Sequence, residues 1–88
     1  MNTLRQAVRE YLAMRRGLGF KLRETSKGLL DFVKFVECHR SSCITQALAL
    51  AWAQQPSNAQ PARWAQRLSY VRGFARYRSA TDPRTQIP

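Results

Sequence analysis

The chain has 88 residues and a formal net charge of +10 at pH 7, from 15 lysines and arginines against five acids. So strong an excess of positive charge in a small domain points first to nucleic acid, ahead of a membrane surface or an acidic protein. Its 44% hydrophobic content suffices for one small core and excludes wholesale disorder. Because no apolar run approaches the roughly 18 residues of a spanning helix, and arginines interrupt the first twenty residues, we expect no membrane span and no secretion signal, and we predict a cytoplasmic location.

The first predicted helix covers residues 3–16, and Thr3 is placed to cap its start. Apolar residues at helical spacing predict its buried face: Leu4, Val8, Tyr11 and, one turn on, Leu18. Gly17 and Gly19 are expected to end the helix, because glycine reaches the left-handed conformation of a C-terminal cap easily. Phe20 is then expected to fill the core from the turn.

The second predicted helix covers residues 22–39 and has two unlike faces. Its apolar face comprises Leu22, Leu29, Phe32, Val33 and Val36. The opposite face carries a basic stripe of Arg23, Lys27 and Lys34, which Glu24 and Asp31 partly neutralise. On this helix alone, an ordinary solvated face explains the stripe as well as a binding face does. Gly28 costs up to about 1 kcal/mol against alanine inside a helix, so it either allows close approach of another backbone or is simply tolerated.

A short third helix is predicted from Thr45 to Gln55, ahead of a turn that starts at Pro56. No charged residue occurs between Ser41 and Ala62, and Trp52 falls on the inward face. This helix is therefore interpreted as packing and not as a binding surface.

The fourth predicted helix, residues 61–78, combines five arginines with four aromatic residues and no acid. Pro61 suits the first helical turn, where its missing N–H costs nothing. The expected core stripe consists of Trp64, Leu68, Val71 and Ala75. One flank of that stripe gathers Arg63, Gln66, Arg67 and Tyr70. Positive charge with no acid beside it indicates a polyanionic partner.

Periodicity is lost after Arg78, and Pro83 and Pro88 disfavour further helix. The sequence therefore predicts an all-α fold, a compact bundle of four helices with short loops. We expect one domain over residues 1–79. Residues 80–88 are interpreted as the start of a linker to a domain that this chain lacks.

No set of residues for catalysis or for metal binding is found in the sequence. Cys38, His39 and Cys43 fall short of a closed four-ligand zinc site, and the single histidine has no acid placed to form a triad. RGLGF follows a helix and not a strand, so it does not fit a phosphate-binding loop. We therefore expect no catalytic residue, no metal and no cofactor.

Four stretches resemble the N-terminal core-binding domain of tyrosine-type site-specific recombinases, the phage-integrase family. They are RGLGFKLRETSKGLLDFVKFVE, ITQALALAWA at 44–53, PARWAQRLSYVRGFARYR and the closing DPRTQIP. The most specific is RWAQRLSYVRGFARY, in which arginine-Leu-Ser is followed by Val-Arg and an aromatic pair. The resemblance covers about residues 4–88.

The resemblance implies a four-helix, SAM-like bundle that grips one face of a duplex, while a catalytic domain closes a C-shaped clamp from the other side. Its second and fourth helices, here 21–38 and 61–78, would enter or border the major groove of a recombination half-site. Its first helix would help to join recombinase protomers on DNA. The nucleophilic tyrosine would lie beyond Pro88, so this chain alone is expected to be a monomeric DNA-binding fragment and not an enzyme, acting in the recombination and integration of a mobile element.

The expected DNA contacts are Lys21, Arg23, Lys27, Lys34, Arg63, Gln66, Arg67 and Tyr70. Replacing Arg63 and Arg67 together with alanine is expected to weaken duplex binding and to leave the thermal midpoint nearly unchanged. The alternative function is a helical protein–protein interaction module with an acidic partner. Competition by duplex DNA separates the two, because a duplex displaces nothing from a surface that binds only protein.

Overall fold

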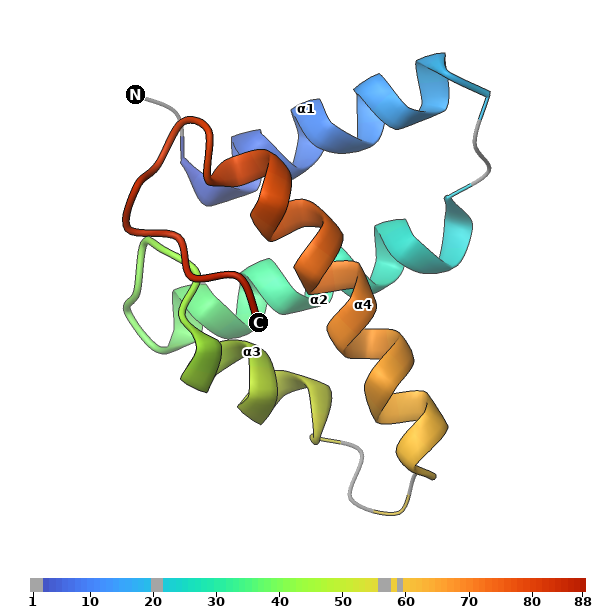
Figure 1. The fold of residues 1–88 in the computed structure, drawn as a ribbon, viewed down its shortest axis with the longest axis vertical. Coiled ribbons are helices and arrows are strands. Elements are labelled where there is room, and N and C mark those ends of the chain that lie inside the picture. Colours follow the sequence, from blue (N-terminus) through green and yellow to red (C-terminus); the bar gives the residue numbers. More distant parts are fainter. Residues whose placement is uncertain (1–2, 20–21, 56–57, 59) are drawn as a thin grey trace.

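Four helices with short connections make up most of the computed structural model, which describes residues 3–19, 22–55, 58 and 60–88. They are α1 (Leu4–Gly17), α2 (Arg23–Cys38), α3 (Gln46–Ala53) and α4 (Pro61–Arg78), and no strand occurs among the described residues. Helices α2 and α4 each contact all three other helices, and α4 runs diagonally across the bundle (Figure 1). The predicted all-α bundle is confirmed, with helix bounds within two residues of the predicted ones.

Thr3 and Thr45, at the predicted starts of two helices, cap α1 and α3. Thr3 Oγ1 accepts the N–H of Gln6 at 3.1 Å, and the Gln6 side chain accepts the N–H of Thr3 at 2.9 Å. This reciprocal capping box satisfies donors that a helix start otherwise leaves without partners. Thr45 Oγ1 accepts the N–H of Leu48 at 3.1 Å in the same way. Gly17 is the last residue of α1, and Gly19 follows with a φ of 92° that favours glycine.

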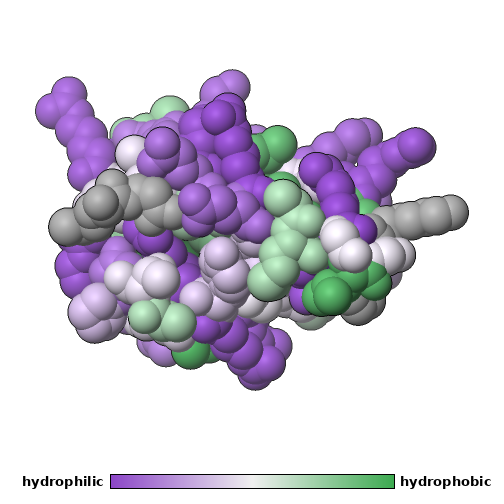
Figure 2. All heavy atoms as spheres, turned by 90° about the horizontal axis from the view of Figure 1, so that it is seen from above, coloured by the Kyte–Doolittle hydropathy of each residue, from purple (hydrophilic) through white to green (hydrophobic). Residues whose placement is uncertain are grey.

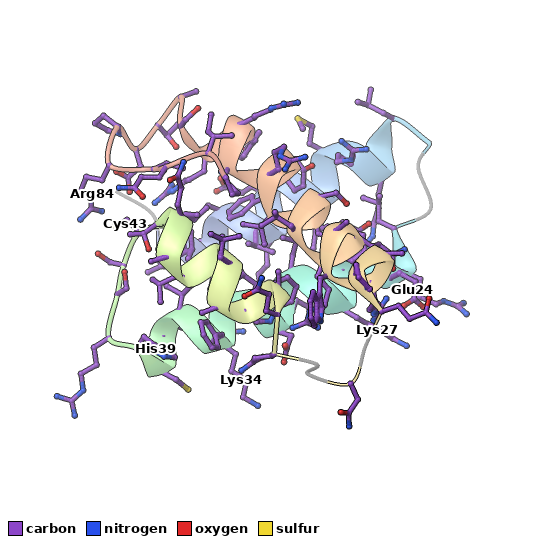
Figure 3. All side chains as sticks on the ribbon, turned by 60° about the horizontal axis from the view of Figure 1, so that its bottom comes forward. Glu24, Lys27, Lys34, His39, Cys43 and Arg84 are labelled. Atoms are coloured by element: carbon purple, nitrogen blue, oxygen red, sulfur yellow. The ribbon has the colours of Figure 1, made fainter. Side chains whose placement is uncertain are left out.

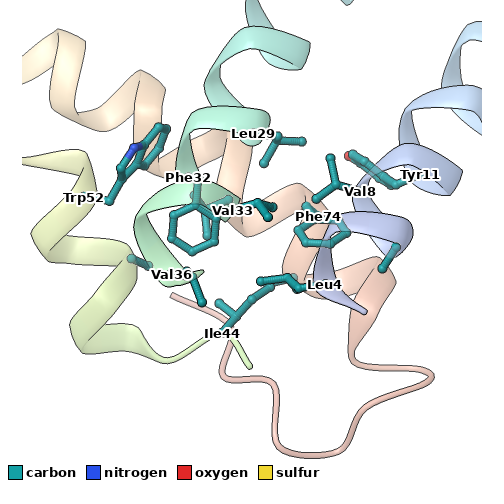
Figure 4. Close-up of a cluster of buried hydrophobic side chains, with 14 of the residues drawn as sticks. Leu4, Val8, Tyr11, Leu29, Phe32, Val33, Val36, Ile44, Trp52 and Phe74 are labelled. Atoms are coloured by element: carbon teal, nitrogen blue, oxygen red, sulfur yellow. The ribbon is translucent and has the colours of Figure 1, made fainter. Parts of the chain in front are cut away.

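All four helices contribute to one core, together with Ile44 from the connection between α2 and α3 (Figure 4). The five residues of the predicted apolar face of α2 are all buried, and Phe32 meets the Trp52 ring edge-on with centroids 5.3 Å apart. Tyr11 of α1 packs on Phe74 of α4 at 5.5 Å. The predicted apolar face of α2 is thus buried, and Trp52 of α3 is buried as predicted.

Two predictions about the core are wrong. Leu18 is 71% exposed, because it caps α1 and the helical period that placed it on the buried face has ended there. Trp64 is half-buried and lies outside the core cluster. The buried stripe of α4 instead includes Phe74, which is fully buried, beside Val71 and Ala75. The predicted role of Phe20 falls outside the described residues.

Residues 79–88 turn back and pack on the bundle, where they end beside α3 and α4 (Figure 1). Asp82 in this segment is buried, and the backbone N–H of Gln86 donates to the carbonyl of Ile44 at 2.9 Å. That this segment begins a linker stays a prediction, but in the structure it is folded against the helices.

Candidate nucleic-acid interface

Gly28 of α2 lies against the Tyr70 ring of α4. A Cβ built there would lie 2.7 Å from Cδ2 of Tyr70 and 3.7 Å from the Trp52 ring. The absence of a side chain at Gly28 therefore lets an aromatic ring of α4 pack on α2. Close approach of another backbone was one of the two predicted explanations for this glycine, but the close neighbours are the side chains of Tyr70 and Trp52.

The basic stripe of α2 lies on the side of the helix that faces away from the core. Arg23, Lys27 and Lys34 are exposed, and Figure 3 shows Lys27 and Lys34 along the same edge of the molecule. Three ion pairs occur in the described part of the chain, and none of them involves these three cations. Their charge is therefore available to a ligand.

Asp31 lies between the lysines of that stripe, but it makes a contact to α3. Its Oδ2 accepts the indole N–H of Trp52 at 2.8 Å. A buried tryptophan usually finds such a partner for its N–H. The carboxylate of Asp31, predicted to neutralise part of the stripe, therefore also makes a structural contact that joins α2 to α3.

On the N-terminal half of α4, Arg63 and Gln66 are exposed and joined to each other. Arg63 Nη1 donates to Gln66 Oε1 at 2.8 Å. Both residues line an open hollow together with Asn58, Gln60 and Ala62. This pair presents a guanidinium and a carboxamide side by side, which are the two groups that most often hydrogen-bond to base edges in DNA.

Arg67, one turn further along α4, is engaged inside the protein. Its guanidinium carbon lies 3.8 Å from the centroid of the Trp52 ring, and Nη2 donates to the backbone carbonyl of Trp52 at 2.7 Å. Burial lowers the pKa of Arg67 below the usual arginine value, while the negative charge of Asp31 opposes this shift and Arg63 adds to it. Arginine has so high an intrinsic pKa that the side chain stays charged at neutral pH.

The contacts of Arg67 correct the expectation that the Arg63/Arg67 double alanine keeps its thermal midpoint. Loss of Arg67 removes a stacking contact and a hydrogen bond that join α4 to α3, so the double variant mixes stability with binding. Tyr70 is likewise half-buried and packs against the core. Lys21, the remaining predicted contact, lies outside the described residues.

Several other cations are engaged within the protein, which the sequence did not reveal. Arg5 donates to Glu37 at 2.6 Å, and this contact raises the pKa of Arg5 and lowers that of Glu37. Arg78 is buried and lies 3.9 Å from Asp82, while Arg84 reaches the same carboxylate at 2.9 Å. Arg5 and Glu37 lie 32 positions apart in the sequence, so no local pattern indicates their pairing.

Within the described residues, no group of three or more His, Cys, Asp or Glu side chains is arranged to hold a metal ion. Cys38 and Cys43 are free thiols. The face seen in Figure 2 is predominantly hydrophilic, with small separate apolar areas. No helix in the described ranges has both the length and the apolar composition that a membrane crossing requires.

Comparison with known proteins gives one informative match. The chain is 68% identical over all 88 residues to the protein named "Putative integrase/recombinase y4rB" of Sinorhizobium fredii (strain NBRC 101917 / NGR234). The match covers 28% of that protein, so the chain spans less than a third of its relative's length. No protein-family model and no solved structure matches the chain. The predicted resemblance to integrases and recombinases is therefore confirmed, because the whole chain is similar to part of a protein whose name gives it as a putative integrase/recombinase.

Proposed function

We propose that this chain binds double-stranded DNA as the N-terminal, core-binding part of a tyrosine-type recombinase that acts in site-specific recombination and integration. The observation that carries the proposal is a set of exposed cations on two adjacent helices, Arg23, Lys27 and Lys34 on α2 and Arg63 on α4. None belongs to the ion pairs of the described residues. A duplex carries one negative charge per about 1.7 Å of its axis, so it complements such a surface. The relative's name supports the same function.

The two helices supply different chemistry in this proposal. The α2 cations bind phosphate oxygens, which position the domain and supply most of the affinity. Arg63 and Gln66 of α4 reach towards base edges, where one good bidentate pair is worth about 1–3 kcal/mol of discrimination. Arg67 and Tyr70, which the sequence assigned to DNA, act mainly by holding α4 on α2 and α3.

Another part of a longer protein then carries out strand cleavage and joining. Contacts with other recombinase protomers form only on DNA. The chain alone is then half of a clamp. Without the tethered second half it loses a gain in effective concentration that is often about 100-fold or more. We therefore expect non-specific duplex binding with a Kd of about 1–100 μM at physiological salt.

A salt titration of duplex binding, followed by fluorescence anisotropy, tests the proposal. The Lys27→Ala/Lys34→Ala variant should show a log Kd against log salt slope reduced by about two, since both lysines are exposed and each lost phosphate contact lowers the slope by about one. The matched control, Arg9→Ala/Arg76→Ala, removes the same charge from exposed positions on α1 and the C-terminal half of α4. It should keep a slope near that of the wild type. Equal losses in both variants, or no wild-type binding at low salt, would contradict the proposed interface.

A further inference from the structure

The segment that follows α4 touches the start of α3 at three points. The Gln86 side chain accepts the backbone N–H of Gln46, the first residue of α3, at 2.8 Å. The backbone N–H of Gln86 donates to the carbonyl of Ile44 at 2.9 Å, and the Gln46 side chain donates to the carbonyl of Ile87 at 3.3 Å. Gln86 thus satisfies an N–H that the helix itself leaves without an acceptor.

A buried carboxylate holds the same segment in place. Asp82 is 5% exposed and accepts from the backbone N–H and from the guanidinium of Arg84, both at 3.0 Å through Oδ1. Arg84 also donates to Ser42 at 3.3 Å, which ties it to the connection before α3. Figure 3 shows Arg84 beside Cys43 in that connection. We call residues 79–88, held by these contacts, the strap.

Helix α3 depends on such support more than the other helices do. It has eight residues, and an isolated helix of that length is unstable in water. It nevertheless carries Trp52, whose ring and carbonyl hold Arg67 of α4 and whose indole N–H binds Asp31 of α2. The position of α3 therefore affects both helices of the candidate interface.

We infer that the strap is an N-terminal cap of α3 and that, through Trp52, it positions Arg67 within the candidate interface. The role of the strap in folding stands on the contacts alone, whereas its effect on DNA rests on the proposed function. Residues 79–88 then belong to the folded domain and are not a free tether.

Amide hydrogen exchange measured by NMR tests the cap without DNA. Gln86→Ala should speed exchange at the amides of Leu48 and Ala49 and at the Trp52 indole N–H by about 2- to 10-fold, as expected for a lost helix cap. Gln86→Glu should restore slow exchange, because a carboxylate still accepts the Gln46 N–H and suits a helix N-terminus. Gln55→Ala, which shortens the same side chain just beyond the other end of α3, should leave these rates unchanged.

Unchanged exchange rates in Gln86→Ala, or equally faster exchange in α1, would overturn the role of Gln86 as a cap.

Duplex affinity of the same variants then tests whether the cap affects the candidate interface. We expect about 2- to 5-fold weaker binding for Gln86→Ala and wild-type binding for Gln86→Glu and Gln55→Ala. Faster exchange with unchanged affinity overturns the link to the interface. A wild-type chain that binds no duplex refutes the proposed function, while the exchange result still decides the cap.

Discussion

Arg67 combines a position on the candidate DNA-binding flank with contacts that hold the protein together. Its charge lies over the Trp52 ring, and one of its donors is bonded to the Trp52 carbonyl. A partly desolvated cation–π contact is worth about 0.5–2 kcal/mol and a hydrogen bond about 0.5–1.5 kcal/mol. Nothing in the sequence indicates this arrangement, because Trp52 and Arg67 are 15 residues apart and lie on different helices.

We expect Arg67→Ala to lower the free energy of unfolding by about 1–3 kcal/mol, because it removes both contacts with Trp52. Arg63→Ala, on the same flank but exposed, should change it by no more than about 0.5 kcal/mol. Urea unfolding followed by the fluorescence of Trp52 and Trp64 measures both. Equal stabilities for the two variants would mean that the stacked arrangement contributes nothing in solution.

At the scale of elements, the contact between α2 and α4 is set by Gly28. In a free helix, Gly28→Ala would stabilise by up to about 1 kcal/mol. In this protein the new methyl group would lie 2.7 Å from the Tyr70 ring, so the ring or the helix must move. We expect a net loss of about 1–3 kcal/mol in the free energy of unfolding, as for other overpacked cores.

Gly17→Ala is the control, since nothing lies within 4 Å of its Cβ, and it should be neutral or stabilising. Thermal unfolding compares the two, and a Gly28→Ala variant as stable as the wild type would show that the Tyr70 ring or α4 moves aside at little cost.

The elements themselves were largely predictable from local signals. Thr3 and Thr45 mark two helix starts, and the apolar period of α2 identifies every apolar residue of its buried face, which also includes Ser26. Leu18 and Trp64 were placed wrongly for different physical reasons. Leu18 follows the end of α1, so the helical period no longer applies to it. For α4, contacts with α1, α2 and α3 decide which stripe is buried, and a period calculated for one helix contains no information about its neighbours.

Across the whole molecule, the sequence predicted the sign of the charge but not its distribution. A net charge of +10 indicates a polyanionic partner. Which cations remain available depends on pairs between distant segments, such as Arg5 with Glu37 and Arg84 with Ser42. Of the predicted contacts, Arg23, Lys27, Lys34, Arg63 and Gln66 are exposed, and Arg67 and Tyr70 are packed against neighbouring helices. Only the folded arrangement distinguishes these two groups.

Asp82 makes the stability of the folded molecule depend on pH. The hydrogen bonds from Arg84 are the main cause that lowers the pKa of this carboxyl below its ordinary value, and burial partly opposes them. A group whose pKa is lower in the folded state contributes stability above its unfolded pKa, which is about 3.9 for aspartate, and this contribution is lost as the pH falls through the folded value. We therefore expect the urea midpoint to fall as the pH drops below about 4.

Asp82→Asn should be less stable than the wild type at pH 7 and should lose much less stability between pH 4 and pH 3, because the strap of the variant no longer depends on an ionised carboxylate. Glu37→Gln is the comparison. The pKa of Glu37 is also lowered by Arg5, but both side chains are exposed and such pairs contribute little. Urea titrations at pH 7, 4 and 3 provide the measurement. If Asp82→Asn loses as much stability in acid as the wild type, then the strap is not what acid releases, and residues 79–88 are not held by Asp82 in solution.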